Sequence, residues 1–210
     1  MRAVIICGGE IGSIEHARAE IKDGDMIICA DRGYLYAECM GIKPDVVLGD
    51  FDSYSREKIH CKNIIEYPPE KDYTDSEIAV KYACEHGAGE ILFLASTGGR
   101  LDHTLANIYL LRTIEKSGVH GSIFDGTSTT FFVSGKIEIC GSSGDLLSII
   151  PFSEAGDITT ENLGYPLEHA PLTNASMGIS NFFTEEKAAV NIGSGSALVI
   201  YTPLKYLKNE

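Results

Sequence analysis

The sequence predicts an α/β domain with a mostly parallel, Rossmann-like sheet, followed by an all-β sandwich domain. Residues 1–119 alternate short apolar runs with helical patterns, which is typical of a parallel sheet flanked by helices. Residues 120–210 lose the helical pattern and carry short β-rich runs separated by Gly, Ser, Asn and Pro, which indicates an antiparallel sandwich or barrel. The pattern changes near residues 116–122, and we therefore place the domain boundary between residues 119 and 120.

The first half is predicted to contain five strands with helices between them. The expected strands are the apolar runs at 3–7, 25–30, 45–48, 63–67 and 90–95. The expected helices are at 13–21, 34–41, 74–87 and 102–118. Gly41, Gly87 and Gly118 are placed to end three of these helices, because glycine readily adopts the left-handed conformation found at helix ends.

The second half is predicted to consist of six short strands. These are the β-rich runs at 129–134, 136–140, 146–152, 157–160, 188–193 and 197–202. No internal repeat is visible in either half.

Composition excludes several classes of partner. The chain of 210 residues has 30 acidic and 17 basic residues, and its net charge of −13 opposes binding to nucleic acid or to anionic lipid. No apolar run is long enough to cross a bilayer, and the first ten residues lack the features of a signal peptide, so we expect a cytoplasmic protein. The six cysteines form no Cys-x-x-Cys pair and are expected to be reduced core thiols.

Glycine or ionisable residues follow every predicted strand of the first half, where ligands bind in open parallel sheets. These residues are Gly8, Gly9 and Gly12; Asp31, Arg32 and Gly33; Asp50 and Asp52; Asp72 and Asp75; and Arg100, Asp102 and His103. Asp50 and Asp52 point to the same side if the chain stays extended, since side chains alternate along a strand. Asp72 and Asp75 lie at the start of a helix, where they can face the same crevice.

Five carboxylates that converge require either protonation or a divalent cation. Oxygen ligands of this kind suit Mg²⁺, which commonly joins a few carboxylates to substrate phosphates. Any single aspartate is more often a turn or capping residue, but repetition after successive strands favours a metal site. The Gly-rich stretch at 8–12 fits either close approach to a phosphate or a tight turn. Arg100 is the better phosphate ligand, whereas His103 more readily fastens the loop.

Three spaced motifs resemble the thiamine pyrophosphokinase family. They are "DRGYLYAECMGIKPDVVLGDFDS" at 31–53, "KDYTDSEIAVKYA" at 71–83 and "GGRLDHTLAN" at 98–107. A fourth segment, "ENLGYPLEHAPLTNASMGISN" at 161–181, is similar to the thiamine-binding β-domain of that family. The resemblance covers nearly the whole chain.

The resemblance implies a fold, a reaction and an assembly. Members of the family have an α/β nucleotide domain followed by a β-sandwich, and they transfer the pyrophosphoryl group of ATP to thiamine with Mg²⁺. The products are thiamine diphosphate and AMP. Members usually act as homodimers with the active site between subunits, so ATP, thiamine and a second copy are the expected partners.

The resemblance also assigns roles to individual residues. The implied metal and phosphate ligands, and candidates for catalysis, are Asp50, Asp52, Asp72, Asp75 and Asp102. The implied nucleotide-binding residues are Asp31, Arg32, Gly33, Gly98, Gly99 and Arg100. Ser180 and Asn181 are implied to contact thiamine. Asp50, Asp72 and Asp102 all stay open as the group that accepts the hydroxyl proton.

One departure and two alternatives accompany this assignment. Bacterial members often carry glutamate after the Ser-Asn pair, whereas this chain has Phe182, which leaves the contacts to the pyrimidine open. An ATP-dependent enzyme with a different acceptor, either another alcohol or water, keeps the same nucleotide site. A sensor without turnover would be expected to have a broken carboxylate cluster, and here all five aspartates are present.

Overall fold

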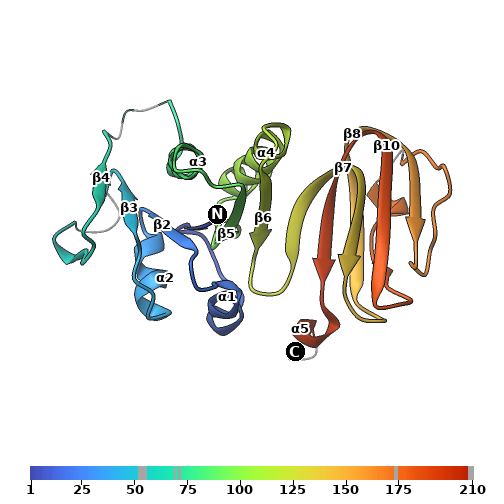
Figure 1. Ribbon diagram of the computed structural model, residues 1–210, viewed down its shortest axis with the longest axis horizontal. Coiled ribbons are helices and arrows are strands. Elements are labelled where there is room, and N and C mark those ends of the chain that lie inside the picture. The colour runs from blue at the N-terminus through green and yellow to red at the C-terminus, as the bar shows by residue number, and fades with distance from the viewer. Residues whose placement is uncertain (52–55, 69, 71, 173–174, 208–210) are drawn as a thin grey trace. The chain divides into compact units, whose positions relative to one another are not determined.

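Figure 1 shows the computed structural model, which describes residues 1–207 except 52–55, 69, 71 and 173–174. The chain divides into two compact units, Met1–Gly126 and Thr127–Glu210, and each is described by itself. No helix among the described residues is long and apolar enough to cross a membrane.

The first unit contains a parallel sheet in the order β4-β3-β2-β1-β5-β6. The strands are β1 (Arg2–Ile6), β2 (Met26–Ala30), β3 (Val46–Gly49), β4 (Ile64–Glu66), β5 (Glu90–Leu94) and β6 (His120–Phe124). The predicted α/β fold class and its first five strands are therefore confirmed. β6 was not predicted as part of this sheet, because "HGSIF" is short and weakly apolar, yet it pairs in parallel with β5.

In the described part of the first unit, four α-helices connect the strands, and Figure 1 shows α1 and α2 on one face of the sheet and α3 and α4 on the other. They are α1 (Ile14–Glu20), α2 (Gly33–Cys39), α3 (Asp75–Glu85) and α4 (Leu101–Lys116), and a 3₁₀ turn follows β3 at Arg56–Lys58. α3 begins with a capping box: the Thr74 hydroxyl accepts from the Glu77 N–H, and the Glu77 carboxylate accepts from the Thr74 N–H. This arrangement satisfies two N–H groups that the helix itself cannot pair.

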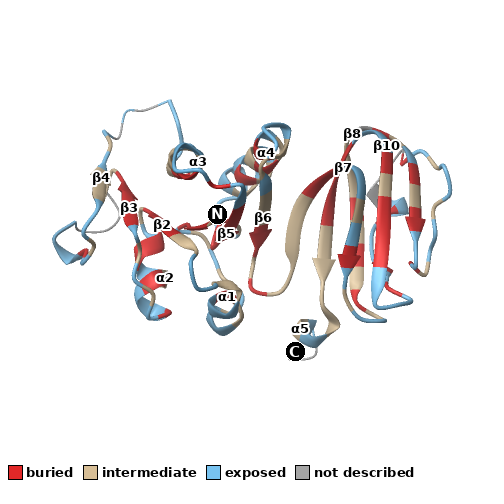
Figure 2. Ribbon diagram, viewed as in Figure 1, coloured by how far each residue is buried: buried red, intermediate tan, exposed pale blue. Residues whose placement is uncertain are grey.

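The central strands are buried on both faces, which explains their uninterrupted apolar sequences. In β1, Ala3 to Ile6 are fully buried, and β3 and β5 are nearly so (Figure 2). α2 packs against β1 so closely that a Cβ atom on Gly33 would lie 1.8 Å from the Ile6 carbonyl oxygen. The close packing of α2 against the end of β1 therefore requires glycine at position 33.

The second unit is antiparallel, in the order β7-β10-β8-β9. The strands are β7 (Thr129–Cys140), β8 (Leu146–Glu161), β9 (Asn181–Phe182) and β10 (Lys187–Thr202), with a 3₁₀ turn at Ala175–Met177 and a short α5 (Leu204–Leu207). The antiparallel β region is confirmed. The six predicted strands join in pairs into β7, β8 and β10.

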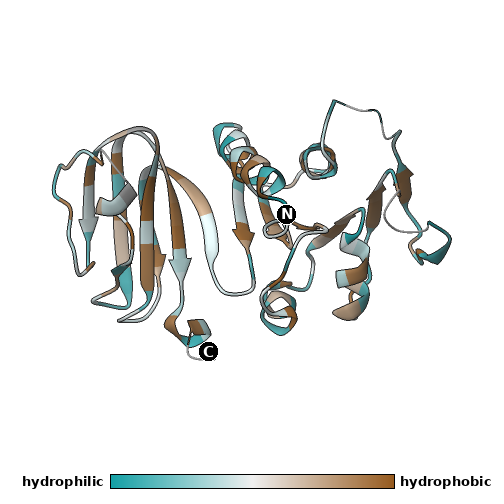
Figure 3. Ribbon diagram, turned by 180° about the vertical axis from the view of Figure 1, so that it is seen from behind, coloured by the Kyte–Doolittle hydropathy of each residue, from teal (hydrophilic) through white to brown (hydrophobic). Residues whose placement is uncertain are grey.

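Irregular pairing, rather than a loop, separates the two halves of these long strands. Between the pairs Ile192–Gly135 and Ala197–Val133, four residues of β10 oppose one residue of β7. The three extra residues reverse which side chains face inward, so Ile192 and Ala197 both reach the core. Both halves of each long strand contribute to one apolar cluster, and Figure 3 shows hydrophobic residues concentrated along the strands.

We expect Gly33→Ala to prevent folding or to lower the free energy of unfolding by more than about 3 kcal/mol, because the clash is with backbone that cannot rotate away. Thermal and urea unfolding would measure this change. Gly89→Ala is the matched control, since a Cβ atom there meets nothing within 4 Å. Equal stability of the two variants would contradict the close α2–β1 packing.

Candidate active site

A cleft of about 720 Å³ opens at the carboxyl ends of the strands in the first unit. It lies beyond the ends of the neighbouring strands β1 and β5. From β1 the chain continues to β2, which pairs with one edge of β1, whereas β5 pairs with the opposite edge. This is the switch point of an open parallel sheet, where the loops after neighbouring strands diverge. The residues that line the cleft are Cys7–Glu10, Ala30–Arg32, Tyr36, Asp50, Thr74–Ser76, Ala95, Ser96, Gly98–Arg100, His103 and Asn107.

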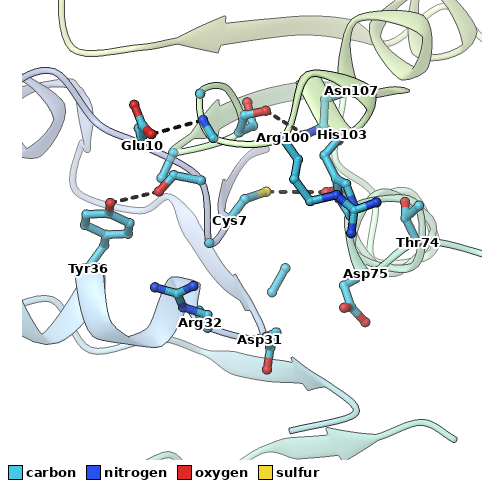
Figure 4. A pocket seen from close by; sticks show the side chains of 18 of the residues that line it. Cys7, Glu10, Asp31, Arg32, Tyr36, Thr74, Asp75, Arg100, His103 and Asn107 are labelled. Carbon is cyan, nitrogen blue, oxygen red and sulfur yellow. Dashed lines mark hydrogen bonds between the residues drawn. The ribbon is translucent and has the colours of Figure 1, made fainter. Parts of the chain in front are cut away.

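The loops after β1 and β5 are held together by their backbones. The Gly9 N–H donates to the Ala95 carbonyl, and the Glu10 N–H donates to the Thr97 carbonyl, both at 2.7 Å. The Tyr36 hydroxyl donates to the Gly9 carbonyl at 2.8 Å and fixes the loop from the side of α2 (Figure 4). The glycine-rich turn after β1 is therefore a rigid wall of the cleft.

Three non-glycine residues just beyond the strands have left-handed backbone conformations. The φ angles are 44° at Asp31, 55° at Phe51 and 52° at Ala95. Such conformations are costly for residues with a Cβ atom and persist where the surrounding structure fixes them. Their grouping at one edge of the sheet supports a binding function for that edge.

The first turn of α3 brings Asp75 and Ser76 to the cleft. The Ser76 hydroxyl lies 3.5 Å from the Cys7 sulfur, which links the start of α3 to the end of β1. Burial raises the pKa of the Cys7 thiol to about 11, so this group stays protonated and uncharged at neutral pH.

The start of α4 carries the best-defined charged contact of the site. The Arg100 guanidinium donates to both carboxylate oxygens of Asp102, at 2.6 and 3.1 Å. These hydrogen bonds lower the pKa of the Asp102 carboxyl to about 2. Deeper in the cleft, Asn107 is buried and donates to the Ser96 carbonyl at 2.7 Å, which anchors the loop to α4.

The structure brings together seven of the residues predicted for nucleotide or metal binding. Asp31, Arg32, Asp50, Asp75, Gly98, Gly99 and Arg100 all line the cleft, and Figure 4 shows several of these side chains around it. Asp72 and Asp102 do not line it, and Gly33 is buried below it. Asp52 lies outside the described residues. Within the described part of the chain, no three Asp, Glu, His or Cys side chains are grouped to hold a metal ion.

The described cleft residues to which the sequence assigns no role include Glu10, Tyr36, Ser76 and Asn107. Glu10 lies in the Gly-rich stretch, and Asn107 ends the "GGRLDHTLAN" motif, so their positions next to recognised motifs were the available signal. Among the described residues of the lining, four carboxylates (Glu10, Asp31, Asp50 and Asp75) and two arginines give a net formal charge of −2.

The two residues predicted to bind the second substrate lie in the second unit. Asn181 is buried, and its carboxamide accepts from the N–H groups of Tyr165 and Phe182 and donates to the Tyr165 carbonyl. Ser180 is exposed, with φ of 59°, and its N–H donates to the Ser148 hydroxyl. The rings of Tyr165 and Phe182, which Asn181 holds, pack edge to face with centroids 5.7 Å apart and remain partly exposed.

Comparisons with known proteins match both units. Residues 17–121 match the family model "Thiamin pyrophosphokinase, catalytic domain", and residues 136–199 match "Thiamin pyrophosphokinase, vitamin B1 binding domain". The thiamine pyrophosphokinase of Bacillus subtilis is 29% identical over 205 residues, which cover 93% of this chain and 96% of that protein.

Solved structures agree with the sequence matches. A thiamin pyrophosphokinase family protein from Enterococcus faecalis superposes with a TM-score of 0.83 at 26% identity, over 96% of this chain and 99% of the other. The thiamin pyrophosphokinase of Geobacillus thermodenitrificans gives a TM-score of 0.82 at 26% identity, over 96% and 97% of the two chains.

The burial of Cys7 predicts selective alkylation. At pH 8 we expect iodoacetamide to modify the exposed Cys39 and Cys140 in the native protein and to leave Cys7 unmodified, because a buried thiol with raised pKa supplies almost no thiolate. Peptide mass spectrometry would measure each site, with labelling in urea as the control for intrinsic reactivity. Native labelling of Cys7 at the rate of Cys39 would show that the cleft floor is open.

Proposed function

The chain belongs to the thiamin pyrophosphokinase family, and we propose that it transfers the pyrophosphoryl group of ATP to the hydroxyl of thiamine, giving thiamine diphosphate and AMP. The observation that carries this proposal is the cleft at the sheet switch point, where Asp50 and Asp75 face the same space as Arg32 and Arg100. Catalysis of phosphoryl transfer rests mainly on alignment and charge neutralisation, and this lining supplies groups for both.

The nucleotide phosphates would bind to cationic and N–H groups of the cleft. Arg32 makes no ion pair with another described residue, so its guanidinium is available to a phosphate. Gly98 and Gly99, which precede α4 and line the cleft, have positive φ angles of 79° and 61°. The N-cap residue Arg100 makes no capping hydrogen bond with its own side chain, and the N–H groups at this helix start favour an anion.

The donor set fits Mg²⁺ when the nucleotide supplies the remaining ligands. Asp50 and Asp75 offer hard oxygen donors on one cleft, and Mg²⁺ is commonly held by one or two carboxylates together with substrate phosphates. When bound, Mg²⁺ neutralises phosphate charge. Asp52, Asp72 and Asp102, which the family resemblance implies as further metal and phosphate ligands, stay part of this proposal.

In the reaction, the thiamine hydroxyl oxygen would attack the β-phosphorus in line with the bond to AMP. The new oxygen–phosphorus bond forms as the bond between the β-phosphorus and the α–β bridging oxygen breaks, and AMP leaves with that oxygen. The hydroxyl proton needs a nearby carboxylate. Among the open candidates, neither Asp72 nor Asp102 lines the cleft, whereas Asp50 does. We therefore propose that Asp50 accepts the proton through the carboxylate oxygen that does not bind the metal ion.

The second unit would bind thiamine through the surface that carries Ser180 and the aromatic pair Tyr165 and Phe182. Exposed rings suit a cationic aromatic ligand, since the ring face attracts positive charge. Asn181 supports this surface from below, because its polar atoms are bonded to the backbone of both aromatic residues.

We further propose a homodimer in which the partner's β unit completes the cleft. Leu101, Leu105 and Tyr109 follow one another at spacings of four residues along α4, which begins at the cleft, and they are 70%, 47% and 58% exposed. An exposed apolar stripe of this kind is typical of an interaction surface.

The expectation that the six cysteines are core thiols is wrong for Cys39, Cys84 and Cys140, which are exposed. We also propose a cytoplasmic location, where exposed cysteines stay reduced.

The central test is Asp75→Asn. We expect it to lower thiamine-dependent AMP release by at least about a hundredfold, as the loss of an electrostatic group at the reacting phosphates does, without lowering the melting temperature. A coupled assay of AMP, run with and without thiamine, would measure this.

Asp23→Asn is the control, because Asp23 is exposed before β2, at the opposite end of the strands. Normal turnover in Asp75→Asn would contradict the assignment. AMP formation that does not respond to thiamine would instead favour another acceptor, such as water.

A further inference from the structure

The Glu10 side chain folds over the glycine turn at the start of α4. Its carboxylate accepts a hydrogen bond of 3.0 Å from the Gly99 N–H (Figure 4). A Cβ atom on Gly98 would lie within 2.8 Å of three Glu10 side-chain atoms, so the contact extends along the side chain. Glu10 and both glycines line the cleft. The Glu10 carboxylate therefore accepts a hydrogen bond from the Gly99 N–H, a backbone donor at the proposed phosphate site.

The contact is not needed to hold the two loops together. The Glu10 N–H already bonds to the Thr97 carbonyl, and the Gly9 N–H to the Ala95 carbonyl, through backbone atoms alone. The Glu10 residue is exposed, so its carboxylate can exchange the Gly99 N–H for water at little cost. Loss of the side-chain charge should leave the loops in place.

A second donor at the same helix start is also engaged by a carboxylate. Arg100, the residue after Gly99, directs its guanidinium to Asp102. The Gly99 N–H and the Arg100 guanidinium are groups to which phosphate oxygens would bind, and each is bonded to an acid of the chain. A phosphate that enters must replace these carboxylates and also approach a lining whose described residues carry a net charge of −2.

We propose that the Glu10 carboxylate is an internal competitor of the nucleotide phosphates and sets the affinity of the cleft for ATP. This inference rests on the proposed function. In the free protein, Glu10 binds the Gly99 N–H; in the complex, a phosphate oxygen takes that hydrogen bond and the side chain moves into solvent. Glu10 thus weakens nucleotide binding without taking part in the chemistry.

The test compares wild-type protein with Glu10→Gln. Calorimetric titration with Mg²⁺ and α,β-methylene ATP, in which the cleaved bond is replaced, gives the nucleotide Kd. We expect Glu10→Gln to lower this Kd by about two- to fivefold, the size of a surface charge effect at a helix N-terminus. The KM for ATP should fall similarly while kcat stays unchanged. If Glu10 served only to cap α4, the variant would lose stability and gain no affinity.

Glu15→Gln is the matched control, because Glu15 is an exposed carboxylate in the first turn of α1 that does not line the cleft. Its Kd should equal that of wild type. A Kd for Glu10→Gln that is unchanged, or higher, would overturn the inference. Wild-type protein that fails to bind the analogue would instead refute the proposed function.

A measurement on wild-type protein avoids dependence on the variant. The side-chain carboxyl ¹³C resonance of Glu10 and the amide resonance of Gly99 should both move when the analogue saturates the cleft. A Glu10 carboxyl resonance that stays fixed while the analogue binds would show that the carboxylate is not displaced, and would overturn the inference.

Discussion

The switch in strand order between β1 and β5 is the constraint on which the rest of the molecule depends. β1 pairs with β2 on one side and with β5 on the other, so the loops that follow β1 and β5 start side by side and lead to opposite faces of the sheet. Backbone hydrogen bonds between Gly9 and Ala95 and between Glu10 and Thr97 hold these loops together. The strand order therefore creates the cleft. The residues that come directly after the strands supply its lining side chains.

The charges of the cleft bear directly on the proposed binding of a nucleotide together with Mg²⁺. The lining holds more carboxylates than guanidinium groups, so it does not attract a bare polyphosphate. The same carboxylates offer oxygen ligands to a divalent cation, and thiamine is itself a cation. Two of the acids, Glu10 and Asp102, are bonded to groups that would otherwise meet phosphate. The charge of the chain, which disfavours nucleic acid, is consistent with a site that depends on cations.

Much of the fold could be predicted because a parallel strand that is buried on both faces has a continuous apolar sequence. β6 could not, since its identity as a parallel strand comes from pairing with β5 rather than from its own residues. The bulge in β10 could not be read either, because register depends on the partner strand. In the site, the strand ends predicted that five aspartates converge; Asp50 and Asp75 line the cleft, but Asp72 and Asp102 do not. The engagement of Asp102 by Arg100, the structural role of Asn181 and the reach of Glu10 to Gly99 depend on side-chain geometry that no spacing encodes.

A crystal structure with α,β-methylene ATP, Mg²⁺ and thiamine would test the central claim most directly. The account predicts the triphosphate in the switch-point cleft, between Arg32 and the start of α4, with oxygens of Asp50 and Asp75 about 2.1 Å from the metal ion. It also predicts the thiamine hydroxyl facing the β-phosphorus. A nucleotide bound elsewhere, or a metal ion that neither aspartate contacts, would contradict it.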